Sequence, residues 1–242
     1  MVQSLIIEPR YCGPPSSGNG GYTAGLLARA LGEPAEVTLR RPAPLGRPLG
    51  LVREGDTLRL LDGADTVAEA VPTAVETECP DPPTADQARA AAARSFSLAP
   101  DNPFPTCFVC GPDRRHGEGL EIFAGPVPGT GLFAAPWTPA PTLADARGEV
   151  RPEYVWAALD CPGAYTLRPV TTATVLLGRY AVRRLARVEA GREYVVIAWP
   201  LSHHRRKHLA GSALFDDRGA CVAIARAAWI ELRDPSREAV RT

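Results

Sequence analysis

Two short stretches decide how this chain is organised. Residues 19–31 read NGGYTAGLLARAL, and residues 156–163 read WAALDCPG. When the two regions are superposed, Gly20 falls on Arg151 and Arg29 falls on Asp160. The first stretch therefore has a glycine pair without an acid, and the second has an acid without a glycine pair. This division predicts one composite site to which both copies of a repeat contribute.

The sequence around each stretch predicts the same order of elements, a helix followed by four strands. Asn19 can cap a helix that begins near Gly21 and ends before Gly32, and Pro152 suits the first turn of a second helix reaching about Leu167. Apolar residues then alternate with a period of two. The predicted strands cover residues 35–41, 46–53, 57–61 and 66–76 in the first half, and 175–184, 193–201, 207–215 and 220–233 in the second.

Further strand candidates precede the two helices, at residues 4–8 in the first half and at 119–123 and 131–135 in the second. Pro162 should bend the second helix beside Asp160, because proline removes a helical hydrogen bond. The repeat is longer than the roughly 20–50 residues of solenoid units, which favours a duplicated domain over an array. We expect one unit at residues 1–78, a linker with a helix at 79–105, and a second unit at 106–242.

Composition restricts the class of protein. The chain has 242 residues, of which 45% are apolar and 22% charged, as in ordinary globular proteins. Its net charge of zero argues against nucleic acid or an anionic membrane as a partner. No apolar run approaches the roughly 18 residues of a membrane span, and the start of the chain does not resemble a secretion signal. We therefore expect a cytoplasmic protein whose six cysteines are thiols.

The order of elements resembles the hotdog fold. Residues 19–21 followed by AGLLAR are similar to the His-Gly-Gly helix start of hotdog acyl-CoA thioesterases, with Asn19 in place of the histidine. The stretch WAALDCPG is similar to the downstream part of that helix, where the family carries its acidic residue. The resemblance implies an α+β double hotdog, in which two antiparallel sheets, each wrapped around a central helix, form a pseudo-dimer.

The same residues suggest a chemistry. A helix start with two glycines exposes unpaired N–H groups at the positive end of the helix dipole, so Gly20 and Gly21 could polarise a thioester carbonyl. Asn19 could add an amide contact or only cap the helix. Asp160 is the only acid in residues 154–167 and could be a general base or a nucleophile. The alternative is that Asp160 caps a helix or forms a salt bridge within the core.

In hotdog dimers the glycine helix start of one unit generally faces the acid of its partner. The resemblance therefore implies one site per chain, with a degenerate mirror-related site around Arg29 and Arg151. It also implies hydrolysis of an acyl-CoA or acyl-carrier thioester, in which coenzyme A is part of the substrate and no cofactor is needed. Non-catalytic acyl-CoA binding is an alternative. Hydration or dehydration of an acyl thioester is less favoured, because it needs a catalytic histidine and all four histidines lie outside both helices.

Other residues are candidates for substrate contacts. Tyr22 and Trp156 could line the acyl pocket, although aromatic residues at such positions also form cores. Residues 203–208 read HHRRKH and are either a solvated turn or a contact to the phosphates of coenzyme A through Arg205, Arg206 and Lys207. The two halves would form the pseudo-dimer within the chain, and a further homodimer stays open.

Cys107 and Cys110 form a single C-x-x-C pair followed by glycine. A structural zinc ion needs four ligands, so we expect structural thiols and no metal. Zinc and redox chemistry stay as alternatives, and the residues that could complete a zinc site are His116, Cys161, Cys79 and Cys12. Cys161 could act as a nucleophile only beside a basic partner, and no histidine is near it in sequence.

Overall fold

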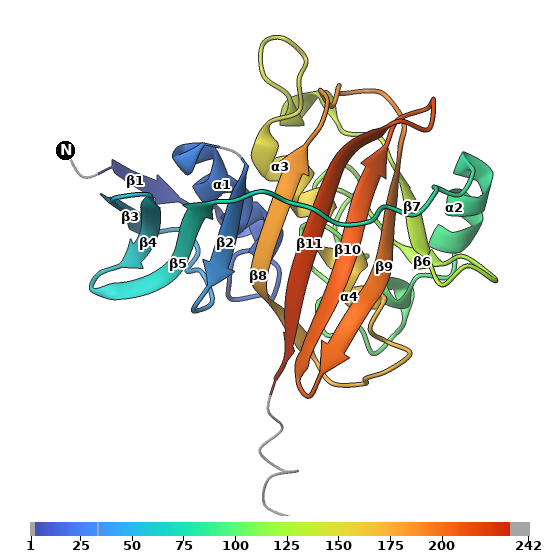
Figure 1. Cartoon of the computed structure of the whole chain (residues 1–242), viewed down its shortest axis with the longest axis horizontal. Coiled ribbons are helices and arrows are strands. Elements are labelled where there is room, and N and C mark those ends of the chain that lie inside the picture. Colours follow the sequence, from blue (N-terminus) through green and yellow to red (C-terminus); the bar gives the residue numbers. More distant parts are fainter. Residues whose placement is uncertain (1–2, 33, 233–242) are drawn as a thin grey trace, which may run out of the picture.

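The computed structural model describes residues 3–32 and 34–232, and its strands form one antiparallel sheet. Within the described residues the sheet has eleven strands, in the order β1-β3-β4-β5-β2-β8-β11-β10-β9-β7-β6 (Figure 1). Their bounds are β1 (Gln3–Ile6), β2 (Ala35–Leu39), β3 (Pro48–Glu54), β4 (Thr57–Asp62), β5 (Asp65–Pro72), β6 (Gly125–Pro126), β7 (Phe133–Trp137), β8 (Val175–Arg184), β9 (Tyr194–His204), β10 (Lys207–Phe215) and β11 (Cys221–Glu231).

Helices from both halves of the chain lie on one face of this sheet. They are α1 (Gly20–Leu31), α3 (Pro152–Ala158) and α4 (Cys161–Tyr165), while α2 (Ala85–Ala92) lies beside β6 and β7 (Figure 1). The segment that leaves β5 crosses the opposite face of the sheet before it reaches α2 (Figure 1). Single turns of 3-10 helix occur at Pro9–Tyr11, Phe96–Leu98 and Pro141–Leu143. None of the helices in the described part is long and apolar enough to span a membrane.

The alternating apolar pattern predicted the main strands correctly, because each has a buried face. All eight strands predicted after the two helices are present, and the first helix starts one residue earlier than expected. The predicted last residue of the final strand, Arg233, lies outside the described residues. Residues 119–123 were predicted wrongly as a strand. Their backbone instead bonds to a loop, with the N–H groups of Leu120 and Ile122 donating to the carbonyls of Phe108 and Val109.

The second helix is broken where the sequence indicated. α3 ends at Ala158 and α4 begins at Cys161, so Asp160 occupies the junction. Pro162 is the second residue of α4 and cannot donate the hydrogen bond that would continue α3. The break directs the Asp160 carboxylate out of the regular helical path and toward the start of α1.

The expectation of two separate sheets was wrong, because β2 pairs with β8. Ala35 is opposite Val182 and Val37 is opposite Tyr180 in this antiparallel pair. The pairing satisfies backbone groups that would be exposed at the edges of two independent sheets. Strands of both halves thus belong to one continuous sheet.

The order of the strands is symmetric about the β2–β8 pair. On one side follow β5, β4, β3 and β1, and on the other β11, β10, β9 and β7. Each half is therefore a strand, then helical residues, then four strands, with matching positions in the sheet. β6 at the outer edge has no counterpart among the described residues.

α1 packs against α3 in the opposite direction, through glycine. A side chain on Gly25 would bring its Cβ within 2.6 Å of the Glu153 Cα and 2.8 Å of the Trp156 Cβ. Gly21 lies one turn earlier and is similarly close to α3 and the junction after it. The two glycines let the helix backbones approach, and this approach positions the start of α1 beside the α3–α4 junction.

Candidate active site

Asn19 caps α1 and also reaches across to the second half of the chain. Its Oδ1 accepts a hydrogen bond from the Tyr22 N–H at 2.8 Å, which satisfies one of the unpaired donors of the first turn. Its Nδ2 is then directed away from the helix and donates to Asp160 Oδ2 at 3.0 Å. The cap therefore fixes the orientation of the amide that holds the carboxylate.

Asp160 is held by a second donor, the Gly21 backbone N–H, at 2.9 Å from the same Oδ2. The contact depends on glycine. A Cβ at position 21 would lie 2.5 Å from the Asp160 Cβ and 2.8 Å from the Trp156 carbonyl oxygen. The structure thus brings Asn19, Gly21 and Asp160 together from opposite halves of the chain.

The role expected of the two glycine amides needs correction. The Gly21 N–H donates to Asp160, so it is not free to receive a substrate carbonyl. The Gly20 N–H has no acceptor among the described residues, and Gly20 lines a cavity. Gly20 is therefore the helix-start amide that could stabilise an oxyanion.

The Asp160 carboxylate is nearly inaccessible to solvent, and only one of its oxygens is hydrogen-bonded. Oδ1 has no partner among the described residues. Burial raises the pKa of Asp160 to about 7, although the hydrogen bonds from Gly21 and Asn19 favour the charged form, and the nearby Cys107 raises the pKa further. Both protonation states of this acid are therefore populated near neutral pH.

A cavity of about 380 Å³ opens beside these residues. Its wall includes residues of the loop before α1, the start of α4, the first part of β8 and the end of β11. Apolar side chains form much of this wall, among them Leu39, Val175, Leu177, Trp229 and Ile230. The space can hold a small apolar group next to Asp160.

Three arginine residues also line the cavity, and the sequence did not single them out. They are Arg40, Arg41 and Arg168. The guanidinium groups of Arg40 and Arg41 form ion pairs with Glu69 and Asp65. Arg40 and Arg41 were included in a predicted strand, but β2 ends at Leu39 and both residues follow it at the cavity wall. The only sequence signal was the position of two consecutive arginines at a strand end.

Neither aromatic candidate for the substrate pocket lines the cavity. Tyr22 stacks on Tyr11 with ring centroids 4.1 Å apart, and Trp156 is fully buried with its ring edge-to-face against Tyr180. Both side chains belong to the hydrophobic core. Trp229 is the tryptophan that lines the cavity.

The exposed turn between β9 and β10 consists of Arg205 and Arg206, and Lys207 is the first residue of β10. None of the three lines the cavity. Arg206 Nη1 donates to the Glu231 carbonyl at 3.1 Å. Both chain neighbours of Glu231 line the cavity, so this turn lies close to its rim.

The other end of the α1–α3 pair carries the residues predicted for a degenerate site. Arg29 Nη1 and Glu153 Oε1 form a salt bridge of 2.6 Å, and the guanidinium of Arg151 lies 3.9 Å from the same carboxylate. Arg151 also donates to the Tyr154 hydroxyl at 3.0 Å. Arg29 and Arg151 thus meet around one acid, and neither a glycine pair nor an aspartate is present there.

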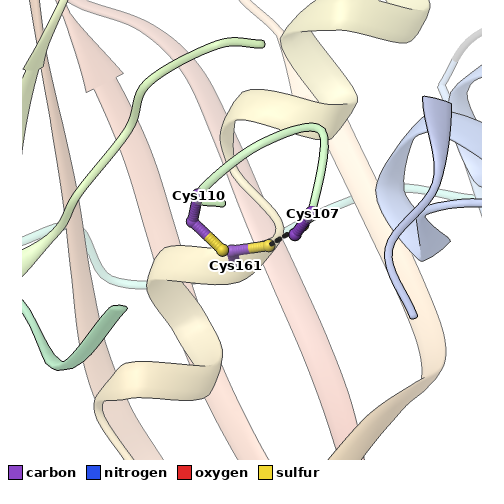
Figure 2. A group of neighbouring side chains, drawn as sticks. All are labelled: Cys107, Cys110 and Cys161. Atoms are coloured by element: carbon purple, nitrogen blue, oxygen red, sulfur yellow. Dashed lines mark hydrogen bonds between the residues drawn. The ribbon is translucent and has the colours of Figure 1, made fainter. Parts of the chain in front are cut away.

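Three thiols gather beside Asp160. Cys107 and Cys110 come from one loop, and Cys161 begins α4 (Figure 2). Their Sγ atoms all lie within 4.8 Å of one another, and those of Cys107 and Cys161 are 3.6 Å apart. Of the four residues considered as further ligands, only Cys161 joins the pair. The others are elsewhere: His116 and Cys79 are exposed, and Cys12 bonds to the Thr106 carbonyl.

No family model matches the sequence, and no curated protein matches it. Solved structures do match over nearly the whole chain. A candidate thioesterase from Novosphingobium aromaticivorans has a TM-score of 0.63 and 15% identity, with 95% of each chain covered. A conserved protein of unknown function with a hotdog fold, from Alicyclobacillus acidocaldarius, has a TM-score of 0.60 and 13% identity, covering 96% of this chain and 93% of its own.

A candidate thioesterase II from Thermobifida fusca is similar as well, with a TM-score of 0.58 and 16% identity. It covers 95% of this chain and 92% of its own. Identities this low establish shape and not activity, because one fold hosts many functions. The single sheet, the helices on one face and the full-length matches together show that this chain has a hotdog fold.

Proposed function

We propose that this protein hydrolyses an acyl thioester of coenzyme A, or of an acyl carrier protein, at the site formed by Asn19, Gly20, Gly21 and Asp160. The observation that carries the proposal is the position of the Asp160 carboxylate. One oxygen is fixed by the start of α1, while the other is unpartnered, in a residue that lines the cavity. Two of the structures similar to this chain are named as candidate thioesterases, which supports the same reaction class.

The proposed reaction uses the two halves of the chain differently. The thioester carbonyl oxygen accepts a hydrogen bond from the Gly20 N–H, where the dipole of α1 favours the developing negative charge. One such donor contributes roughly 3 kcal/mol to a transition state of this kind. Asn19 and Gly21 contribute by holding Asp160 Oδ2, which leaves Oδ1 directed to the reacting group.

Asp160 Oδ1 then accepts a proton from water as the water oxygen attacks the carbonyl carbon. The tetrahedral intermediate collapses, the carbon–sulfur bond breaks, and the leaving thiolate takes the proton. The products are a carboxylic acid and a free thiol. Direct attack by the Asp160 carboxylate, with a mixed anhydride as intermediate, is the variant of this mechanism that the same geometry supports.

The cavity wall suggests where the two parts of the substrate bind. The acyl group would lie against the apolar side chains of Leu177 and Trp229. The phosphates of coenzyme A would bind near Arg40, Arg41 and Arg168, which line the cavity and carry guanidinium groups suited to phosphate oxygens. Arg40 and Arg41 would exchange their ion pairs with Glu69 and Asp65 for these phosphate contacts. Residues 205–207 lie beyond the rim and would be a second basic contact for the distal part of the same ligand.

We also infer that residues 1–78 and 106–242 act as the two units of a pseudo-dimer joined by a linker at 79–105. The mirrored strand order around the β2–β8 pair supports this inference. So does the antiparallel crossing of α1 and α3. With Arg29 and Glu153 paired at the mirror-related position, the chain would have one active site.

Hydration or dehydration of an acyl thioester is the less suitable reaction for this cavity. Hotdog dehydratases need a histidine beside the acid. All four histidines of the chain are described residues, and none lines the cavity. Asp160 is therefore the group on which a test should focus.

The test compares turnover of a panel of acyl-CoA substrates by wild type, Asp160→Asn and Glu153→Gln. Released coenzyme A should be quantified by chromatography, because thiol reagents would also react with the six cysteines of the chain. We expect Asp160→Asn to lower kcat by about 10²–10⁴-fold. Glu153→Gln is the matched control, since it neutralises the other buried carboxylate of the helix pair and should leave kcat within a few-fold of wild type.

Equal turnover by wild type and Asp160→Asn would exclude Asp160 as base or nucleophile. Acyl-CoA binding to wild type without any turnover would instead identify the protein as a non-catalytic acyl-CoA binder.

A further inference from the structure

The three thiols beside the cavity have the spacing of metal ligands. Zinc–sulfur bonds of about 2.3 Å in a tetrahedral site place the sulfur atoms roughly 3.8 Å apart. Cys107 Sγ and Cys161 Sγ are 3.6 Å apart, and the Cys110 Sγ lies within 4.8 Å of both. Figure 2 shows the side chains of the loop converging on Cys161. Small side-chain rotations would therefore bring all three sulfurs to a common ion.

The loop that carries Cys107 and Cys110 is a tight turn. It closes on itself with the Gly111 N–H donating to the Cys107 carbonyl at 2.9 Å. A Cβ at position 111 would lie 2.4 Å from the Cys107 N and 2.6 Å from the Pro105 carbonyl oxygen, so this turn requires glycine. The sequence C-x-x-C-G thus encodes a tight turn with a cysteine at each end.

Hydrogen-bond donors surround the Cys107 sulfur. The Cys110 and Cys161 thiols and the backbone N–H groups of Cys110 and Val109 lie against this sulfur. The Asn19 amide adds a donor from the other half of the chain, with Nδ2 at 3.9 Å from both the Cys107 and the Cys161 sulfur. Donors to sulfur of this kind are typical of the groups that surround metal-bound thiolates.

We propose that Cys107, Cys110 and Cys161 bind one zinc ion, with a fourth coordination position open to the cavity. Three protein ligands and one exchangeable position are the arrangement of zinc sites that accept an external ligand. All three cysteines line the cavity that Asp160 also lines. The fourth ligand is therefore water or a sulfur or oxygen atom of a molecule in the cavity. This inference does not depend on the thioesterase proposal.

The proposed zinc site departs from the expectation from sequence that no metal binds and takes up the zinc alternative with Cys161 as the added ligand. That expectation counted a single C-x-x-C pair and found no second pair with metal spacing. Cys161 is 51 positions beyond Cys110 in sequence, and it joins the pair only because α4 starts at the edge of the cavity.

The test measures metal binding alone, without any thioester. Purified full-length protein, reduced and stripped of metal, is titrated with Zn²⁺ against a chromophoric chelator, and its metal content is measured by mass spectrometry. In parallel, Co²⁺ is added under anaerobic conditions and its absorption spectrum recorded. We expect one zinc ion per chain, and a cobalt complex with thiolate charge-transfer bands and the strong visible bands of tetrahedral coordination.

The variants for this test are Cys161→Ser and Cys107→Ser. Cys221→Ser is the matched control, because Cys221 is a free cysteine as partly buried as Cys161 but lies on β11 outside the cluster. Loss of one thiolate ligand should weaken zinc affinity at least about 10-fold, because removal of even a hydrogen-bonding partner of a ligand has an effect of this size. It should also abolish the charge-transfer bands. Cys221→Ser should bind as wild type does.

Three results would overturn the proposal. The first is a reduced wild-type protein that holds no zinc and gives no cobalt charge-transfer bands. The second is Cys161→Ser binding zinc as tightly as Cys221→Ser. The third is a Cys107–Cys161 disulfide, found by mass spectrometry in protein kept under reducing conditions. If Cys107→Ser does not fold, the wild-type spectrum and the Cys161→Ser titration still decide the question.

Discussion

Each end of the α1–α3 pair holds a buried carboxylate, but the groups that face it differ. Asp160 accepts hydrogen bonds from the Gly21 N–H and the Asn19 amide, which are neutral. Glu153 faces the guanidinium of Arg29 at 2.6 Å. Neutral donors orient a carboxylate without cancelling its charge, whereas a guanidinium does both. The comparison suggests that one end is arranged to exchange a proton and the other to stabilise the helix pair.

The comparison also predicts which end of the α1–α3 pair lowers the stability of the fold. A buried carboxylate without a cation costs free energy, and a paired one costs less. The Asp160 end should therefore be the less stable of the two when its acid is ionised. The experiments below test that difference, beginning with the largest expected effect.

The free energy of unfolding should depend on pH through Asp160. Its pKa is raised from 3.8 to about 7, so the folded chain keeps a proton that the unfolded chain releases. Stability from this group is thus present below about pH 4 and is lost as pH rises through 7. The loss amounts to about 4 kcal/mol at most. Asp160→Asn cannot titrate and should lack this loss.

Urea unfolding of metal-free wild type and Asp160→Asn at pH values from 4 to 8 measures this effect. Relative to wild type, the variant should gain stability steadily over this range and reach a plateau above pH 7. Parallel stability curves for the two proteins would show that burial does not perturb the Asp160 carboxyl.

The second prediction separates the effect of a glycine substitution on Asp160 from its effect on the packing of α1 against α3. Gly21→Ala and Gly25→Ala each place a Cβ within 3 Å of atoms of the opposing segment, so each should destabilise the fold by about 2–3 kcal/mol. Only Gly21→Ala displaces Asp160. We expect its kcat to fall at least about 100-fold, while Gly25→Ala keeps near-normal turnover per folded molecule. Thermal unfolding and acyl-CoA turnover, both on the same samples, give the answer. Equal activity losses would mean that helix spacing alone controls the reaction.

The smallest predicted change in stability concerns the salt bridge between Arg29 and Glu153. Arg29→Met leaves Glu153 buried without its closest cation, which should cost about 2 kcal/mol. This is less than the roughly 3–5 kcal/mol of a fully buried pair, because the Arg29 side chain is 47% exposed. Arg29→Met combined with Glu153→Gln should recover most of the loss in a denaturant titration, with turnover unchanged throughout. A stability loss that the second substitution does not relieve would assign the effect of Arg29 to packing.

Local pattern was enough to predict most of the fold. Alternating apolar residues predicted eight strands, and Pro162 predicted the bend beside Asp160. The approach of Asn19 to Asp160 was also predictable, because the hotdog resemblance implies that the helix start of one unit faces the acid of the other. What the pattern could not give is the single sheet, since the β2–β8 hydrogen bonds join backbone groups from distant parts of the chain regardless of side-chain identity.

The side-chain contacts within the site were also harder to predict, because they form between residues that are distant in the sequence. Which of Gly20 and Gly21 has a free N–H depends on where the Asp160 carboxylate lies. The approach of Cys161 to Cys107 depends on how a loop packs against α4. The arginines of the cavity wall are ordinary surface residues in sequence. Each of these contacts is set by tertiary packing and has no periodic signal.

The distance along the chain between the two parts of the site has a consequence for synthesis. Asn19 and Asp160 are 141 residues apart. At translation rates of about 5–20 residues per second, α1 would wait roughly 7–28 s for the segment that buries it. During that interval β2 lacks its β8 neighbour, and an unpaired strand edge is a site of aggregation. The emerging first half should therefore be a stronger chaperone client than the finished protein.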